Sequence, residues 1–462
     1  MIYSKSYIIG FCLLFFSNWI SAQTEKVFQY EEYIEIVQSH HPIVFQAFLK
    51  TQKGEAYITK ARGGFDPKLY GNANQKYYDD KQYYSHLNAG LKVPTWFGLE
   101  FSGGYSNNDG NFLNPEINTP DLGLWNLGVS VNLGNGLFID QRRAELKQAD
   151  IYFSSSEMEQ KLMVNQLVYD ASVAYFDWQK AYYKVKTYST AKAAALYRLE
   201  NVVNSIRLGD LPQIDSLKAK IQLQDRELNL EQAQMELTVK KLNLETFLWQ
   251  EGFLPLEMDS TMRPSELITI DNSTPTPLNF DQLVENHPDF VMAQNNIAIS
   301  KIDFRLKKEQ LKPDLSIKYN ALTSHADPQN YNVENYNWGA SLSYPIFTRK
   351  ERGNMKIAQF ELQERESKLQ DKRAVINYKI QAAYEMMVST KDQVGIAEEV
   401  KSNYELLLQA EESLFNIGES SLFLVNTRDL SRIDASIKWI EIYNAFRISQ
   451  AMYDYQIMKF TP

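Results

Sequence analysis

The residues best suited to metal binding or acid–base chemistry are few and scattered. The sequence has five histidines, at His40, His41, His86, His287 and His325. A metal site built on His40 and His41 needs further ligands at fixed geometry, and no cluster of them lies nearby in the sequence. His41 and His287 each precede a proline, which favours a structural role at a helix break. We therefore predict no metal ligand, no catalytic residue and no cofactor.

Sequence motifs for enzyme chemistry are missing as well. The chain has no glycine-rich phosphate loop, no nucleophile elbow and no metal-binding motif. Its carboxylates mostly follow the polar faces of helices, as at Glu361, Glu364 and Glu366, where they are expected to be solvated. The formal net charge of −9 is the opposite of what a nucleic-acid binder carries. We expect neither an enzyme nor a nucleic-acid partner.

The first 22 residues have the pattern of a secretory signal peptide. Lys5 precedes an apolar stretch, and Ser21-Ala22 form a small-residue cleavage site. A membrane anchor is the alternative, but the apolar stretch is short for a membrane span. The only cysteine, Cys12, lies inside this segment, so the mature chain is expected to have no disulfide and no thiolate. No later apolar run reaches the roughly 18 residues of a spanning helix, which fits either a soluble periplasmic protein or a β-barrel.

The chain contains an internal repeat. Four landmarks of the first half recur in the same order in the second half, with an offset that falls from 246 residues to about 210. The first half therefore carries extra residues between its second and third landmarks. The paired landmarks are His41-Pro42 and His287-Pro288, Pro67 and Pro313, Gly128 and Gly339, and Gly209 and Gly418.

Each repeat is predicted to contain helices, strands, a very long helix, a tight turn and another helix. Repeat 1 is expected at 23–249, with helices at 30–63, 140–208 and 212–248 and strands within 68–134; a linker at 250–278 leads to repeat 2 at 279–462, with helices at 279–311, 350–416 and 421–458 and strands within 314–345. A helix of 68 residues is about 100 Å long. Such a length indicates coiled-coil packing against other long helices.

The predicted strands alternate apolar and polar residues, as barrel strands do when one face meets lipid and the other meets water. We predict six strands, because the extra residues of repeat 1 hold two more alternating runs joined at Pro94–Gly98. The segments 78–86 and 107–123 are expected to be longer polar loops. Two alternatives stay open: a soluble sandwich has the same alternation, and the extra hairpin can fold outside the barrel wall.

These features resemble the outer membrane efflux protein family, also called the TolC family. The tandem helix–strand–helix repeat, the His-Pro landmarks and the paired turns carry the resemblance. It implies an α+β membrane protein in which three chains share one outer-membrane β-barrel and one coiled-coil barrel of long α-helices in the periplasm. It also implies an adaptor protein, an inner-membrane pump and outer-membrane lipid as partners. The family usually has four strands per chain, so six is a departure.

The resemblance places two turns at the periplasmic tips, where the family contacts its adaptor and opens. The family's acidic pair after the second turn falls near Leu424 and Thr427, so an acidic ring there is in doubt. Other charges near the turns are candidates for the gate or lumen, and an ordinary solvated helix face is the alternative. The turn residues are Gly209, Asp210, Leu211, Pro212, Gly418, Glu419, Ser420 and Ser421; the charges are Asp215, Arg428 and Asp429.

We therefore predict an exit duct in the outer membrane, serving tripartite efflux or type I secretion. One rival is a periplasmic coiled-coil scaffold or adhesin, which would lack strands facing lipid. Another is an envelope enzyme, which would require a convergent polar pocket. The alternating strands disfavour the first rival and the missing motifs disfavour the second. The sequence does not distinguish efflux from secretion or name the transported substrate.

Overall fold

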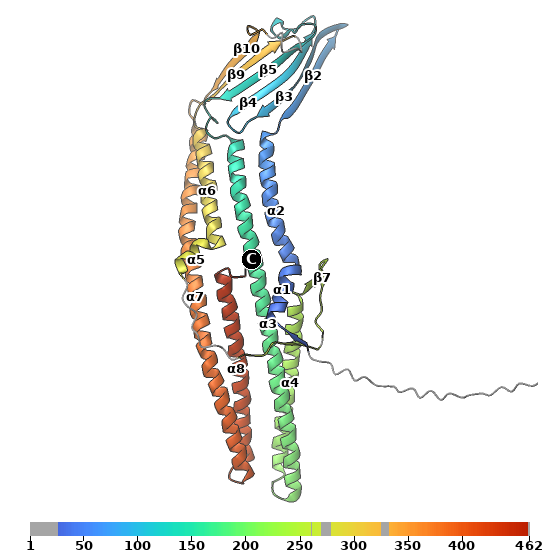
Figure 1. Ribbon diagram of the computed structural model, residues 1–462, viewed down its shortest axis with the longest axis vertical. Helices are drawn as coiled ribbons and strands as arrows, with labels where there is room; N and C mark the ends of the chain where they lie inside the picture. The colour runs from blue at the N-terminus through green and yellow to red at the C-terminus, as the bar shows by residue number, and fades with distance from the viewer. Residues whose placement is uncertain (1–25, 260, 269–278, 325–331, 461–462) are drawn as a thin grey trace, which may run out of the picture.

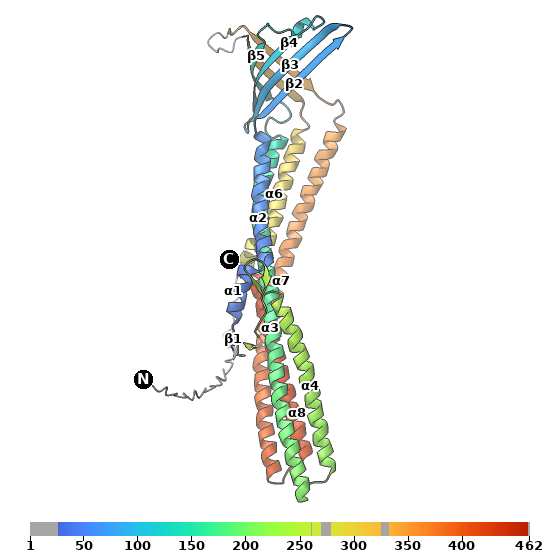
Figure 2. The ribbon, with the colours of Figure 1, turned by 90° about the vertical axis from the view of Figure 1, so that its right-hand side faces the viewer.

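The computed structural model is an elongated wall of helices with one β-sheet at its upper end (Figure 1). A view from the side shows the long helices running from the sheet to two hairpin tips at the far end (Figure 2). The structure describes residues 26–259, 261–268, 279–324 and 332–460. The expected signal peptide at 1–22 and part of the 250–278 linker lie outside the described residues.

The two repeats have matching sets of helices. The longest helices, α3 and α7, each contain 68 residues, because neither contains a proline and each is followed within two residues by a glycine that ends it. The helix expected at 212–248 is shorter, and the one expected at 279–311 is divided in two. Repeat 1 has α1 Tyr30–His40, α2 Pro42–Arg62, α3 Gln141–Leu208 and α4 Ile214–Glu245; repeat 2 has α5 Phe280–Asn286, α6 Pro288–Glu309, α7 Arg349–Asn416 and α8 Leu422–Gln456.

The same histidine device produces the helix break in both repeats. His41 ends α1 and caps α2, because its Nδ1 accepts a hydrogen bond from Ile43 N at 3.1 Å. His287 does the same for α6, accepting from Asp289 N at 3.2 Å. The proline that follows each histidine fits the first position of a helix, where its missing N–H is not needed. The predicted structural role of these two histidines is what the structure shows.

The six main strands form one antiparallel sheet in the order β10-β9-β5-β4-β3-β2. The extra hairpin of repeat 1, β3 with β4, is part of this sheet and does not fold outside it. Both outer strands, β10 and β2, pair on one side only among the described residues. The bounds are β2 Lys68–Tyr78, β3 Lys81–Pro94, β4 Leu99–Asp109, β5 Leu124–Asn132, β9 Asp314–Thr323 and β10 Tyr336–Ser343.

The prediction of a long loop at 78–86 was wrong. The strands β2 and β3 are joined directly through Asp79 and Asp80, whose φ angles are +54° and +53°. Two consecutive residues with positive φ make the hairpin turn whose twist matches that of the flanking strands, and Asp tolerates this conformation better than most residues. The polar run Asp79-Asp80-Lys81-Gln82 had suggested a longer loop.

Two pairs of short strands lie beside the helices near the middle of their length. Strand β1 Lys26–Phe28 pairs in parallel with β8 Met262–Pro264, while β6 Trp249–Gln250 pairs with β7 Leu254–Pro255. Gln179 of α3 donates a hydrogen bond to Ser265 O at 2.9 Å. The described part of the linker therefore packs against α3.

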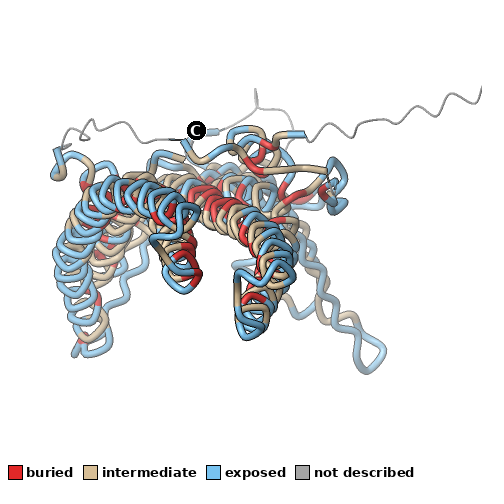
Figure 3. The backbone as a smooth tube through the Cα atoms, turned by 90° about the horizontal axis from the view of Figure 1, so that it is seen from below, coloured by how far each residue is buried: buried red, intermediate tan, exposed pale blue. Residues whose placement is uncertain are grey.

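Buried residues concentrate where helices face one another inside the chain (Figure 3). The largest hydrophobic cluster lies at the level of these short strands, where Tyr33, Tyr175 and Leu244 are completely buried. The helix α7, at the left of Figure 3, is mostly exposed, with far fewer buried residues than α3. Exposed apolar side chains along a long helix, such as Ile357, Phe360 and Met386 of α7, are typical of a surface that is covered by another chain.

Candidate functional site at the helical tips

Both helical hairpins end in the same glycine turn. Gly209 has a φ of +89° and Gly418 a φ of +83°. After α3, Gly209 N donates to Ile206 O at 3.1 Å and Asp210 N donates to Ser205 O at 2.9 Å. This pair of bonds is the Schellman motif, which satisfies the last carbonyl groups of a helix and requires a left-handed residue, usually glycine.

The second hairpin repeats that geometry. Gly418 N donates to Phe415 O at 3.0 Å, and Glu419 N donates to Leu414 O at 2.9 Å. The Ser421 hydroxyl then accepts from Leu424 N at 3.4 Å and caps α8. The turn residues proposed from the sequence thus form the tips of two long hairpins, as Figure 1 shows at its lower end.

The charged residues of the first tip form few ion pairs among the described residues. Asp210 is exposed, and Asp215 forms an ion pair with Lys218 at 2.9 Å. Lys218 is 56% exposed, so solvent screens this pair and it contributes little to stability. Pro212 precedes α4, whose first residue is Ile214. The first tip therefore presents an open, solvated turn.

The second tip is held by a charged pair inside the hairpin. Glu411 of α7 is 8% exposed, and its carboxylate pairs with Arg428 of α8 at 3.4 Å. The Ser420 hydroxyl also donates to this carboxylate. Arg428, proposed as a gate or lumen charge, is thus engaged within its own hairpin, and Glu411 was not identified from the sequence.

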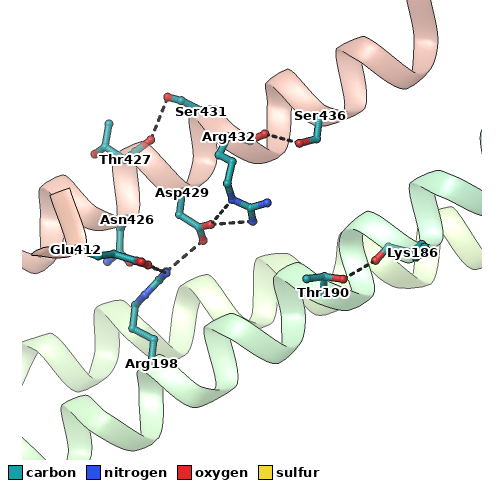
Figure 4. A network of polar contacts seen from close by, with 10 residues as sticks. All are labelled: Lys186, Thr190, Arg198, Glu412, Asn426, Thr427, Asp429, Ser431, Arg432 and Ser436. Carbon is teal, nitrogen blue, oxygen red and sulfur yellow. Dashed lines mark hydrogen bonds and ion pairs between the residues drawn. The ribbon is translucent and has the colours of Figure 1, made fainter. Parts of the chain in front are cut away.

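A second polar cluster joins the two hairpins (Figure 4). Asp429 of α8 is 2% exposed, and its Oδ2 pairs with Arg198 of α3 at 3.2 Å. The same guanidinium donates to Asn426 Oδ1 at 3.2 Å, and Asp429 Oδ1 pairs with Arg432 at 3.1 Å. We call Arg198, Asn426 and Asp429 the hairpin clasp. It places Asp429 between α3 and α8, inside this chain.

Sequence reasoning missed Arg198, although a signal for it exists. Arg198 lies eleven residues before Gly209, and Asp429 lies eleven residues after Gly418. Residues at equal distances from the two tips face one another when the hairpins lie side by side at the same level. Apolar contacts beneath the clasp fix that level, since Val202, Ala219 and Leu422 form one buried cluster from α3, α4 and α8.

Two kinds of feature, metal-binding clusters and membrane-spanning helices, are absent from the described ranges. No group of three or more histidine, cysteine, aspartate or glutamate side chains is arranged to hold a metal ion in the part of the chain that the structure describes. Within the same ranges, every helix lacks the combination of length and apolar character that crossing a membrane requires.

Comparison with known proteins identifies the second repeat. Residues 279–427, which run from the start of α5 into α8, match the family described as outer membrane efflux protein. Residues 279–427 are therefore similar to an outer membrane efflux protein domain. This confirms the resemblance predicted from the repeat and the turns. The matched domain contains the second tip and Asn426 of the clasp. No curated protein sequence matches the chain.

Solved structures share the fold of this outer membrane efflux protein domain and its partner repeat. The CmeC outer membrane channel of Campylobacter jejuni has a TM-score of 0.67 at 12% identity, covering 93% of this chain and 86% of CmeC. The MtrE outer membrane channel of Neisseria gonorrhoeae has a TM-score of 0.65 at 13% identity, covering 93% and 88%. VceC of Vibrio cholerae, an outer membrane protein, has a TM-score of 0.64 at 13% identity, covering 92% and 95%.

Proposed function

We propose that this chain is one protomer of a trimeric duct that crosses the outer membrane and extends into the periplasm. In this proposal the duct is the exit of a tripartite efflux or type I secretion system and is not an enzyme. The observation that carries it is a sheet with two unpaired edges placed directly above helices of 68 residues. The channel descriptions of CmeC and MtrE support the same reading.

The open edges of the sheet require further copies of the chain. Unpaired backbone groups of an edge strand cannot face lipid, because nothing there replaces their hydrogen bonds to water. Pairing β10 of one copy with β2 of the next satisfies both edges at once. Three copies of a six-stranded sheet give a barrel of about 18 strands, a size that leaves an aqueous channel.

The helices offer a matching contact between copies. Exposed apolar residues recur every seven positions on α4 and at steps of seven or fourteen on α7, which is the spacing of a coiled-coil seam. Leu228 lies 19 residues beyond Gly209, and Val400 lies 18 residues before Gly418, so the two rows sit at the same level. The rows are Ile221, Leu228, Met235 and Leu242 on α4, and Met386, Val400, Leu407 and Leu414 on α7.

The tips supply the proposed contact with a periplasmic adaptor and the proposed gate. Gly209, Pro212 and Gly418, with their neighbours in the turns, present exposed backbone at the end of each hairpin. In this proposal the hairpin clasp keeps the two hairpins together in the closed duct. Asp429 acts through its ion pair with Arg198, and Arg428 acts through its ion pair with Glu411. Asp215, near the open first tip, is the remaining candidate for a charge facing the lumen. An inner-membrane pump would supply the solute.

Imaging and cross-linking of the detergent-purified protein test the duct. Electron microscopy should show a threefold cylinder with a helical part of about 100 Å. The mature chain has no cysteine, so Leu228→Cys with Val400→Cys should give disulfide-linked trimers. Leu228→Cys with Glu399→Cys, which turns the second thiol away from the seam, is the matched control. A rod without a barrel, or a monomer that does not cross-link, would favour the scaffold or adhesin instead.

A further inference from the structure

The polar face of the sheet carries an unusual balance of charge for this acidic chain. Side chains opposite one another in a sheet point to the same face, so the strand register identifies every residue on it. Within the six described strands, this face holds more cations than carboxylates, whereas the whole chain has a net charge of −9. The cations are Lys68, Lys76, Lys81, Lys92 and Lys318, and the carboxylates are Glu100 and Asp314.

Two of these lysines lie directly opposite one another. Lys68 of β2 pairs in register with Lys92 of β3. Like charges in this position are destabilising, because the two Cβ atoms are only about 5 Å apart. Neither ammonium group has a carboxylate within ion-pair distance among the described residues. The register therefore places two exposed cations side by side on this face with no carboxylate of the described ranges to neutralise them.

The carboxylates near this pair are already engaged. Glu100 pairs with Arg142 at 3.8 Å, and Asp140 pairs with both Arg142 and Arg143. Asp314 accepts a hydrogen bond from Asn132 at 2.7 Å. Arg142 and Arg143 thus neutralise Glu100 and Asp140, whereas Asp314 is bound by the neutral amide of Asn132.

The wall around the lysine pair is shaped to hold Lys92 in place. The ring of Tyr70 lies beneath the Lys92 ammonium, with 5.3 Å between nitrogen and ring centroid. This ring has space only because β3 carries Gly90 opposite it, where a Cβ atom would come within 2.6 Å of the Tyr70 hydroxyl oxygen. A glycine thus fixes the position of an aromatic ring, and the ring supports a cation.

Lys92 and Lys318 border a cavity at the base of the sheet, whereas Lys68 is not among its lining residues. The cavity has a volume of about 610 Å³, and its lining also includes Arg142, the carboxylates of Glu100 and Asp140, and several serine and asparagine side chains. Lys318 lies three strands from Lys92, which is about 14 Å at the usual strand spacing. Lys92 therefore links the lysine pair to the cavity, and Lys318 extends the positive potential along the same wall.

We propose that Lys68 and Lys92 form a binding site for the oxyanion groups of passing solutes, such as carboxylate or phosphate. With Lys318 the site forms a positive belt at the base of the sheet. The assignment to the lumen rests on the proposed duct, and the binding site itself rests only on the strand register and the unpaired charges. Rings of lysine and arginine are the usual means by which pores favour anions.

Inorganic phosphate is the probe for the site. In phosphorus NMR, the full-length protein in detergent should broaden the phosphate signal, and Lys68→Gln with Lys92→Gln should reduce that broadening severalfold. The matched control is Lys53→Gln with Lys60→Gln, which removes the same charge from exposed positions on α2. Equal broadening by the wild type and the double variant would overturn the site.

Reversal potentials in planar bilayers separate this inference from the proposed duct. Under a potassium chloride gradient, Lys68→Gln with Lys92→Gln should shift the selectivity toward potassium, and the α2 control should not. Conducting channels with unchanged selectivity would overturn the belt while the duct stands. Absence of conductance from every variant, with phosphate broadening still dependent on Lys68 and Lys92, would overturn the duct while the anion site stands.

Discussion

The two repeats of this chain agree in their backbone devices and differ in their charged contacts. His41 and His287 cap equivalent helices through the same atom, and Gly209 and Gly418 end helices of equal length. The second tip, in contrast, is held by Glu411 and contributes Asp429 to the clasp. Features that the backbone requires are thus duplicated, whereas features that join one repeat to the other occur once.

The two repeats also differ in the strands that they contribute to the sheet. Repeat 1 contributes four strands to the sheet and repeat 2 contributes two. The added hairpin, β3 with β4, brings Lys92 opposite Lys68 and provides the glycine beneath Tyr70. Repeat 2 has no comparable lysine pair in its described strands. The insertion therefore changes the chemistry of the polar face as well as the number of strands.

Removing the clasp carboxylate should expose the difference between the tips most clearly. Asp429→Ala leaves the partly buried Arg432 without its anion and leaves Arg198 with only Glu412, which is 3.7 Å away and more exposed, at a cost of about 3 kcal/mol. Asp215→Ala at the first tip removes only a solvent-screened pair, at about 0.5 kcal/mol. Urea unfolding of the two detergent-purified variants compares them directly. Equal losses would mean that the two tips are held alike.

The helices that carry the hairpin clasp could be predicted from the sequence, but the contact between Arg198 and Asp429 could not. The limits of α3 were predictable because Asp140 caps its start and Gly209 stops it. The pairing of Arg198 with Asp429 depends on the relative level of two hairpins more than 200 residues apart. Tertiary packing by Leu422 and Val202 sets that level, and no local pattern records it.

Two other errors have local physical causes. The helix range predicted at 279–311 did not include the break at His287, although the His-Pro pair predicted a helix break at this histidine, which supplies the N-cap of α6. The two-residue turn at Asp79 and Asp80 was predicted to be a longer loop, because the polar run of residues 79–82 extends into the start of β3 and hides the strand there. The six strands were predictable, since their central segments alternate clearly.

Substitution of the turn glycines should affect both repeats equally. Gly209→Ala and Gly418→Ala force an alanine into the left-handed region, at about 1 kcal/mol each. No atom lies within 4 Å of a Cβ at either site, so backbone strain is the only cost. Gly395→Ala, inside α7 with equally open space, should instead stabilise the chain by about 0.5–1 kcal/mol. Unequal losses at the two turns, measured by urea unfolding, would contradict their equivalence.

The capping histidines should give both repeats the same pH dependence. Burial lowers the pKa of His41 and of His287, and each must stay neutral at Nδ1 to accept its cap hydrogen bond. Their contribution is therefore complete above the unfolded pKa of about 6.5 and is lost as pH falls through the lowered folded value.

Replacing both histidines tests this dependence. His41→Asn with His287→Asn keeps a good cap without titration. The double variant should therefore lose less stability than the wild type between pH 7.5 and pH 5, by about 1 kcal/mol. Each single variant should account for about half of the difference. Thermal unfolding at the two pH values measures it, and a variant as acid-sensitive as the wild type would show that other groups dominate.

The smallest expected effect distinguishes the lysine pair from an ordinary lysine on the same face. Lys68→Gln removes a like-charge repulsion against Lys92 and should stabilise the protein by about 0.3 kcal/mol. Lys76 lies above the ring of Tyr83 at 4.5 Å, so Lys76→Gln should destabilise it by about 0.5 kcal/mol. The opposite signs are measurable as shifts of the unfolding midpoint at low salt, and added salt should shrink the Lys68→Gln effect first, because that effect is charge repulsion across solvent. A loss of stability on replacing Lys68 would mean that the pair is already neutralised within the folded chain, and the wall would then have no unpaired charge to offer an anion.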